Sequence, residues 1–88
     1  MNKYYFVVKN EDFFEIKYAE TEKERKEKQI LFRDCNLITI FKGSFSTEED
    51  SFKIHNTVLE TIEKANKTGT FSKKLLEQRI KDKDFEKI

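Results

Sequence analysis

Two tyrosines and an arginine are the residues whose types and spacing could act on a phosphate. Tyr4 lies in a predicted first strand, Tyr18 ends a predicted second strand, and Arg25 follows in the first turns of a helix. If the strands form a hairpin, both tyrosines lie near its open end, close to where that helix begins. A phenolate can serve as a base, and a guanidinium can clamp a phosphate through two parallel hydrogen bonds. The alternative is that the tyrosines lie at the core boundary with their hydroxyl groups in water.

Metal and thiol chemistry have few candidate residues. The chain has one cysteine, Cys35, and one histidine, His55, which are too few for a zinc site. Cys35 could act as a nucleophile with His55 as its partner, but a single cysteine before a buried strand is typical of a small apolar residue. His55 is expected at the edge of the core, bonded to a backbone group. The acidic residues 48–50 could bind Mg²⁺, although acids are favoured at any helix N-terminus.

Basic residues near the second strand and first helix form the other candidate site. With Tyr18 they are the candidate binding residues: Lys17, Tyr18, Lys23, Arg25 and Lys26. Glutamates lie between the basic residues of the helix, a pattern typical of a solvated helix face. The chain carries 18 basic and 17 acidic residues, a net charge of +1, so nucleic-acid binding would require these cations to gather on one face.

The pattern of apolar residues predicts an α+β fold in the order β-β-α-β-α-α. Aromatic and β-branched runs predict strands, and apolar residues three and four apart predict helices. Thr21 and Glu24 form a capping box at the first helix, and Gly69 is the expected left-handed cap of the second. We expect Glu22/Lys26 and Glu24/Lys28 ion pairs in the first helix. The expected strands are 3–9, 13–18 and 36–43, and the expected helices run to Arg33, over 48–66 and over 73–85. In the last helix we expect Leu76 and Ile80 to point inward.

Length and composition predict one small folded domain, residues 1–88. A chain of 88 residues has one core at most, and nine Phe and three Tyr supply apolar area to a chain that is 40% charged. The single cysteine and the absence of a signal-peptide pattern predict a reduced, cytoplasmic protein. No apolar run approaches the ~20 residues that span a bilayer, so no membrane partner is expected.

The order of elements resembles that of the GIY-YIG nuclease superfamily, especially its short branch associated with phages and mobile elements. The stretch EIKYA, residues 15–19, occupies the place where the family has Tyr-Ile-Gly-x-Thr, and Arg25 falls six residues after Ala19. The resemblance covers residues 3–72, which leaves residues 73–88 as a C-terminal helix and charged tail. It implies a three-stranded, mostly antiparallel sheet with helices packed against it.

The resemblance also implies which residues would cut DNA. Family members use a tyrosine base, an arginine clamp and a helix glutamate that holds one divalent metal ion, here Tyr4, Arg25 and, as a loose substitute, Glu49 with Mg²⁺. If the hairpin turn is shortened, Phe6 takes the place of Tyr4. Glu15 and Lys17 stand where the family has its second tyrosine and its glycine, and Ser51 stands at the usual place of the glutamate. Lys17 would also repel a metal ion. The resemblance therefore implies a degenerate fold without cofactor or catalysis.

The sequence thus predicts a small non-catalytic binding protein with a protein or nucleoprotein partner. A phage or mobile-element inhibitor of a bacterial nuclease or CRISPR system, acting by occupying a surface, fits the size and charged surface. The alternatives are a metal-dependent DNA endonuclease that uses Tyr4, Arg25 and Glu49, and a small nucleic-acid-binding regulator. The sequence identifies neither the partner nor the oligomeric state.

Overall fold

A computed structural model describes residues 2–34, 36–81 and 85–87 of the chain. The elements follow in the order β1 (Asn2–Asn10), β2 (Phe13–Ala19), α1 (Glu22–Arg33), β3 (Leu37–Ser44), α2 (Glu48–Thr68), α3 (Lys73–Lys81) and β4 (Phe85–Lys87). The predicted α+β fold and the order of its first six elements are confirmed. Cys35 lies outside the described residues.

The sheet is antiparallel, with the strand order β2-β1-β3-β4. The sequence predicts three strands, and the structure adds a fourth, because β4 pairs with β3 through Phe41↔Lys87 and Gly43↔Phe85. The prediction that the last helix reaches Phe85 is therefore wrong, since α3 ends at Lys81. A strand of three residues is too short for an alternating pattern to show among charged neighbours.

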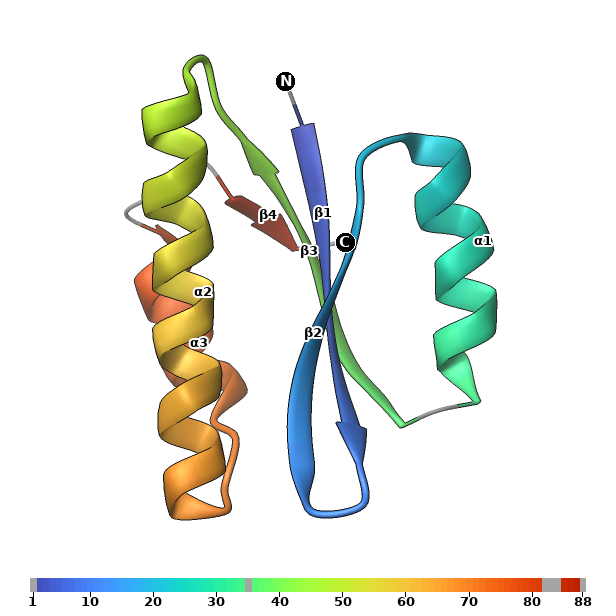
Figure 1. Ribbon diagram of the computed structural model, residues 1–88, viewed down its shortest axis with the longest axis vertical. Helices are drawn as coiled ribbons and strands as arrows, with labels where there is room; N and C mark the ends of the chain where they lie inside the picture. Colours follow the sequence, from blue (N-terminus) through green and yellow to red (C-terminus); the bar gives the residue numbers. More distant parts are fainter. Residues whose placement is uncertain (1, 35, 82–84, 88) are drawn as a thin grey trace.

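Helices cover both faces of the sheet, with α1 on one side and α2 and α3 on the other (Figure 1). Side chains alternate along a strand, so β1 supplies both faces. Tyr5 and Val7 pack with Val58 of α2 and Leu76 of α3, as predicted for Leu76. The side chain of Ile80, which was expected to point inward too, lies outside the described part. On the other face the buried residues are Tyr4, Phe6, Ala19 and Ile40, with Phe32 and Leu37 packed against them.

Helix boundaries follow the local signals in the sequence. The Thr21 hydroxyl accepts from the Glu24 amide at 3.1 Å, and Thr47 caps α2 in the same way through the Asp50 amide. Gly69 ends α2 with φ of 77°, a backbone conformation that favours glycine. The radius of gyration is 12.4 Å, close to the roughly 12 Å expected of a compact chain of this length. None of the described helices combines the length and apolar character needed to cross a membrane.

Candidate functional site

The structure brings Tyr4 and Arg25 together, with Glu22 between them. Tyr4 lies on the α1 face of the sheet and is only 5% exposed. Its hydroxyl donates to the Glu22 carboxylate at 2.6 Å. The Arg25 guanidinium carbon lies 5.9 Å from the centre of the Tyr4 ring. These contacts join the first turn of α1 to β1.

The guanidinium of Arg25 is already occupied by its own helix. Its Nε donates to Glu22 Oε1 at 2.8 Å, a second nitrogen donates to the same oxygen, and a third donates to Gln29. The Arg25 side chain is 13% exposed. A phosphate clamp needs a guanidinium whose donors face the ligand, and here Glu22 takes that place.

The electrostatics of this cluster oppose a role for Tyr4 as a base. The hydrogen bond to Glu22, with burial and the negative charge of Glu22, raises the pKa of Tyr4 above its ordinary value. The same hydrogen bond from Tyr4, together with those from Arg25, lowers the pKa of Glu22. Near neutral pH, Tyr4 therefore keeps its proton and Glu22 keeps its charge.

Tyr18 lies on the other face of the sheet, so the expected pair of tyrosines beside Arg25 does not form. Tyr18 pairs in register with Tyr5, while Tyr4 pairs with Ala19, and neighbouring residues of a strand point to opposite faces. The Tyr18 ring packs edge-on against Tyr5, and Lys3 Nζ lies 4.6 Å from its centre. Burial raises the pKa of Tyr18.

His55 lies at the edge of the core, as predicted, but its described contact is with an aromatic ring. The rings of His55 and Tyr18 are 5.5 Å apart, and His55 is half-buried. Burial, and then the charge of Lys3, lowers the pKa of His55. The imidazole is therefore neutral at pH 7.

Glu49, the third residue of the nuclease hypothesis, lies in the first turn of α2, which covers the face opposite α1. Its side chain is 80% exposed, and its carboxylate forms an ion pair with Lys53 at 3.6 Å. Among the residues that the structure describes, no three His, Cys, Asp or Glu side chains are grouped so that they could hold a metal ion.

The predicted binding residues are spread over two surfaces. Lys17 forms an ion pair with Glu15 at 3.3 Å on β2, whereas Lys23 and Lys26 are exposed on α1. The predicted pair of Glu24 and Lys28 forms at 3.8 Å. Glu22 was expected to pair with Lys26 and instead binds Arg25 and Tyr4. Tyr4 lies 18 residues away on β1, so helical spacing does not reveal this partner.

A basic ledge on α1 was not predicted from the sequence. A shallow depression of about 310 Å³ is lined by Arg25, Lys26, Gln29, Ile30 and Arg33. We call Lys26, Ile30 and Arg33 the α1 ledge, because these three are exposed whereas Arg25 is held inward. Ile30 is 66% exposed between two cations. The spacing of 26, 30 and 33 places all three side chains on one helix face, a signal that was available in the sequence.

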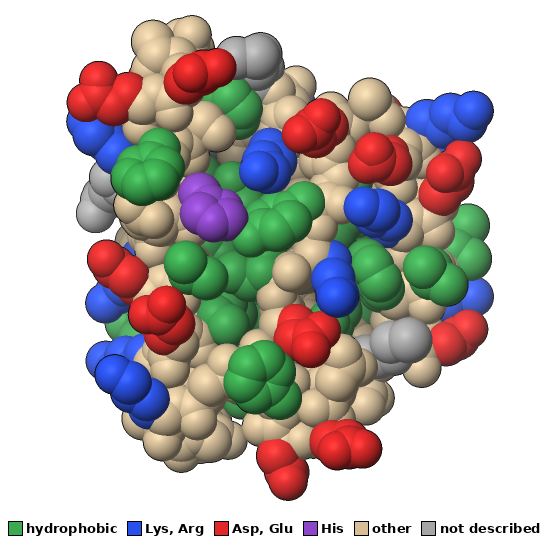
Figure 2. Space-filling view, viewed as in Figure 1, with side chains coloured by type: hydrophobic (Ala, Val, Ile, Leu, Met, Phe, Trp, Pro, Cys, Tyr) green, Lys and Arg blue, Asp and Glu red, His purple; other side chains and the backbone are tan. Residues whose placement is uncertain are grey.

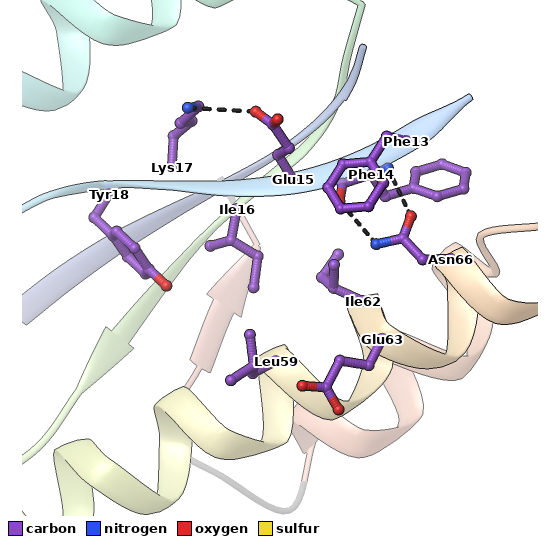
Figure 3. A pocket seen from close by; sticks show the side chains of 10 residues that line it. All are labelled: Phe13, Phe14, Glu15, Ile16, Lys17, Tyr18, Leu59, Ile62, Glu63 and Asn66. Carbon is purple, nitrogen blue, oxygen red and sulfur yellow. Dashed lines mark hydrogen bonds and ion pairs between the residues drawn. The ribbon is translucent and has the colours of Figure 1, made fainter. Parts of the chain in front are cut away.

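A second depression lies between β2 and α2. It has a volume of about 340 Å³, and its lining includes Ile16, Tyr18, Leu59, Glu63 and Asn66 (Figure 3). At one end the Asn66 side chain bonds the backbone of Phe14. Asn66 comes from a helix 52 residues further along the chain, so the sequence offers no local signal for this contact.

Comparison with protein-family models, with curated proteins and with solved structures finds no match. The resemblance to GIY-YIG nucleases therefore stays a prediction, and the function has to be argued from the geometry of the chain itself.

Proposed function

We propose that this chain is a non-catalytic binding protein that attaches to an acidic protein surface through the α1 ledge. The observation that carries the proposal is the exposure of Ile30 between Lys26 and Arg33. An isolated exposed apolar residue is common, but one flanked by two cations on a helix that buries no residue fully is suited to an interface. The fitting partner has an apolar hollow rimmed by carboxylates.

The state of Tyr4 and Arg25 supports binding over catalysis. A nuclease of the predicted type needs a tyrosine that gives up its proton and an arginine that faces a phosphate. The Tyr4 hydroxyl keeps its proton and donates a hydrogen bond to Glu22, and Arg25 is bound by Glu22 and Gln29. Both residues fasten α1 to the sheet and so hold the ledge in place.

A protein partner fits the ledge better than nucleic acid does. Binding driven by counterion release needs several phosphate contacts, and Arg25 is already engaged. An exposed isoleucine between the cations gains nothing from phosphate groups and gains free energy from an apolar pocket. Within this proposal, a phage or mobile-element inhibitor that covers the surface of a bacterial nuclease or CRISPR complex is the instance we favour.

Binding to purified CRISPR and restriction complexes tests this proposal. We expect one complex to bind the wild-type chain and to lose at least about tenfold in affinity when Lys26 and Arg33 are both changed to Glu, since the new glutamates would face the carboxylates of the partner and like charges across an interface are strongly unfavourable. The matched control changes Lys64 and Lys67, exposed on α2, to Glu with the same change in net charge. Equal loss in both variants would contradict a role for the ledge.

The nuclease and nucleic-acid alternatives have their own tests. Nicking of plasmid DNA with Mg²⁺ or Mn²⁺ that is abolished by Arg25→Ala would favour the nuclease and contradict our proposal. Nucleic-acid affinity that falls steeply between low and moderate salt would favour the regulator.

A further inference from the structure

The outer edge of β2 has backbone groups that β1 does not pair. β2 is the first strand of the sheet and pairs only with β1 among the described strands. The amide of Phe14 donates to Asn66 Oδ1 at 2.8 Å, and Asn66 Nδ2 donates to the Phe14 carbonyl at 3.1 Å. Both backbone groups of Phe14 therefore point away from β1. In an antiparallel ladder the direction alternates, so the backbone groups of Ile16 and Tyr18 point outward as well.

Among the described residues, side chains bind the backbone groups of this edge at both of its ends but not at its centre. The Asn66 side chain binds the backbone N–H and C=O of Phe14, and Lys28 of α1 donates to the backbone carbonyl of Tyr18. In the described part of the chain, no side chain reaches the outward N–H and C=O of Ile16. These groups are one donor and one acceptor on the same residue, an arrangement that fits the backbone of another strand.

The residues around Ile16 are self-complementary. If a second copy lies antiparallel with its Ile16 opposite this one, each Ile16 donates to the carbonyl of the other. The same register sets Glu15 of each copy opposite Lys17 of the other, and Phe14 opposite Tyr18. Opposite charges facing each other across strands stabilise the pairing, and aromatic pairs add to it.

The charges also exclude the neighbouring registers. A shift of two residues sets Lys17 opposite Lys17 in one direction and Glu15 opposite Glu15 in the other, and like charges directly opposite are unfavourable. A shift of one residue sets the backbone groups of Ile16, which point away from β1, opposite those of Lys17 or Glu15, which point toward β1. Such a shift also turns each side chain to the opposite face of the sheet. One register is therefore favoured over the others.

The surroundings of the edge are apolar. Figure 2 looks onto this side of the molecule, where hydrophobic side chains gather between α1 and α2 beside His55. Phe13 on β2 is 55% exposed, and Leu59 of α2 points toward Ile16 across the depression (Figure 3). Glu15 and Lys17 lie on the other side of the strand, where they form their ion pair. Pairing at Ile16 would bring these apolar groups under cover.

We propose that two copies of this chain form a two-fold symmetric dimer by antiparallel pairing of their β2 edges around Ile16. The pairing joins two four-stranded sheets into one continuous sheet. A two-fold axis perpendicular to that sheet keeps both α1 helices on one face. The dimer then presents two α1 ledges on the same side, which would raise the avidity for a partner with repeated sites. The pairing itself does not depend on the proposed function.

Sedimentation equilibrium of the intact chain tests the dimer. The wild-type protein should form a species of twice the 10.6 kDa chain mass. Glu15→Lys alone, or Lys17→Glu alone, should weaken dimerisation at least about tenfold, because each substitution sets like charges opposite each other. Both side chains are partly exposed, so the variants should fold, which circular dichroism checks.

Mixing the two variants distinguishes this register from any other interface. In the mixture each lysine of one chain faces a glutamate of the other, so a mixed dimer should form with an affinity close to that of the wild type. A wild-type chain that stays monomeric at all concentrations would overturn the proposal, even if a strand of another protein binds this edge. A dimer that neither substitution weakens, or a mixture that associates no better than the single variants, would overturn it equally.

Discussion

At the scale of single residues, the cluster of Tyr4, Glu22 and Arg25 shows how residue types suited to phosphate chemistry can serve to hold two elements together. The decisive group is Glu22, which accepts from both other residues. A carboxylate in this position binds the guanidinium and raises the pKa of the phenol, so Tyr4 stays protonated near neutral pH and Arg25 is engaged within its own helix. Its position one turn before Arg25 on α1 makes this arrangement local and stable.

Ionisation of the tyrosines checks this interpretation. The pKa values of Tyr4, Tyr5 and Tyr18 are all raised, that of Tyr5 to about 12 through burial first. We expect the folded chain to form tyrosinate at a higher pH than the chain unfolded in urea, whose tyrosines titrate near pH 10. Because the pKa values are raised in the folded state, the stability they contribute is complete below about pH 10 and is lost as the pH rises through the folded values.

Ultraviolet absorbance of tyrosinate measures this directly, since the chain has no tryptophan. The control is Tyr4→Phe, which should remove one titrating group at high pH and leave the tyrosinate absorbance near neutral pH unchanged. Because Glu22 loses its hydrogen bond from Tyr4, the variant should also melt at a temperature lower by a few degrees. Tyrosinate that appears near neutral pH in the wild type and disappears in Tyr4→Phe would contradict our account and support a tyrosine base.

At the scale of elements, the parts that could be predicted are those whose signals are local. The Thr21 cap of α1 and the end of α2 at Gly69 each depend on residues close to the helix end, and both are confirmed. Contacts between distant segments could not be predicted. The bonds of Asn66 to Phe14 join residues 52 apart, and β4 is recognised only by its pairing with β3.

The first helix depends on its cap and its anchors more than on burial, because α1 buries no residue fully. We expect Thr21→Ala to lower the free energy of unfolding by about 1 kcal/mol, since the Glu24 amide loses its acceptor. Hydrogen exchange at the amides of Glu24 and Arg25 should become faster as the first turn frays.

Thr47→Ala is the matched control in α2, where the bond to the Asp50 amide has the same length, 3.1 Å. It should cost a similar free energy, but the amide of Val58 should keep its protection because that part of α2 is buried in the core. Unchanged exchange at Glu24 in Thr21→Ala would show that the anchors Tyr4 and Lys28 hold the first turn without its cap.

At the scale of the whole molecule, the two edges of the sheet are treated differently. Side chains of α1 and α2 guard the ends of the β2 edge and leave its centre open. At the other side, β4 covers the edge of β3 over residues 41–43. An open edge strand is a site for pairing with another chain, but the outermost strand on this side, β4, has only three residues and offers few backbone groups, so association is restricted to the β2 edge. This asymmetry favours closed dimers over open chains of molecules.

Removing β4 tests that asymmetry. A chain that ends at residue 84 should lose about 1–3 kcal/mol of unfolding free energy, because Phe41, Lys42 and Gly43 lose their strand partners. It should also associate beyond a dimer at high concentration, since the eight-residue β3 then forms the second edge of the sheet in place of the three-residue β4. Urea unfolding and light scattering measure the two effects.

Glu86→Ala is the control, because it keeps the strand and alters only an exposed side chain opposite Lys42, so it should change stability by less than about 0.5 kcal/mol. If the shortened chain scattered light no more than this control, the β3 edge would not need its cover, and the choice between the two edges would have to come from the charges around Ile16 alone.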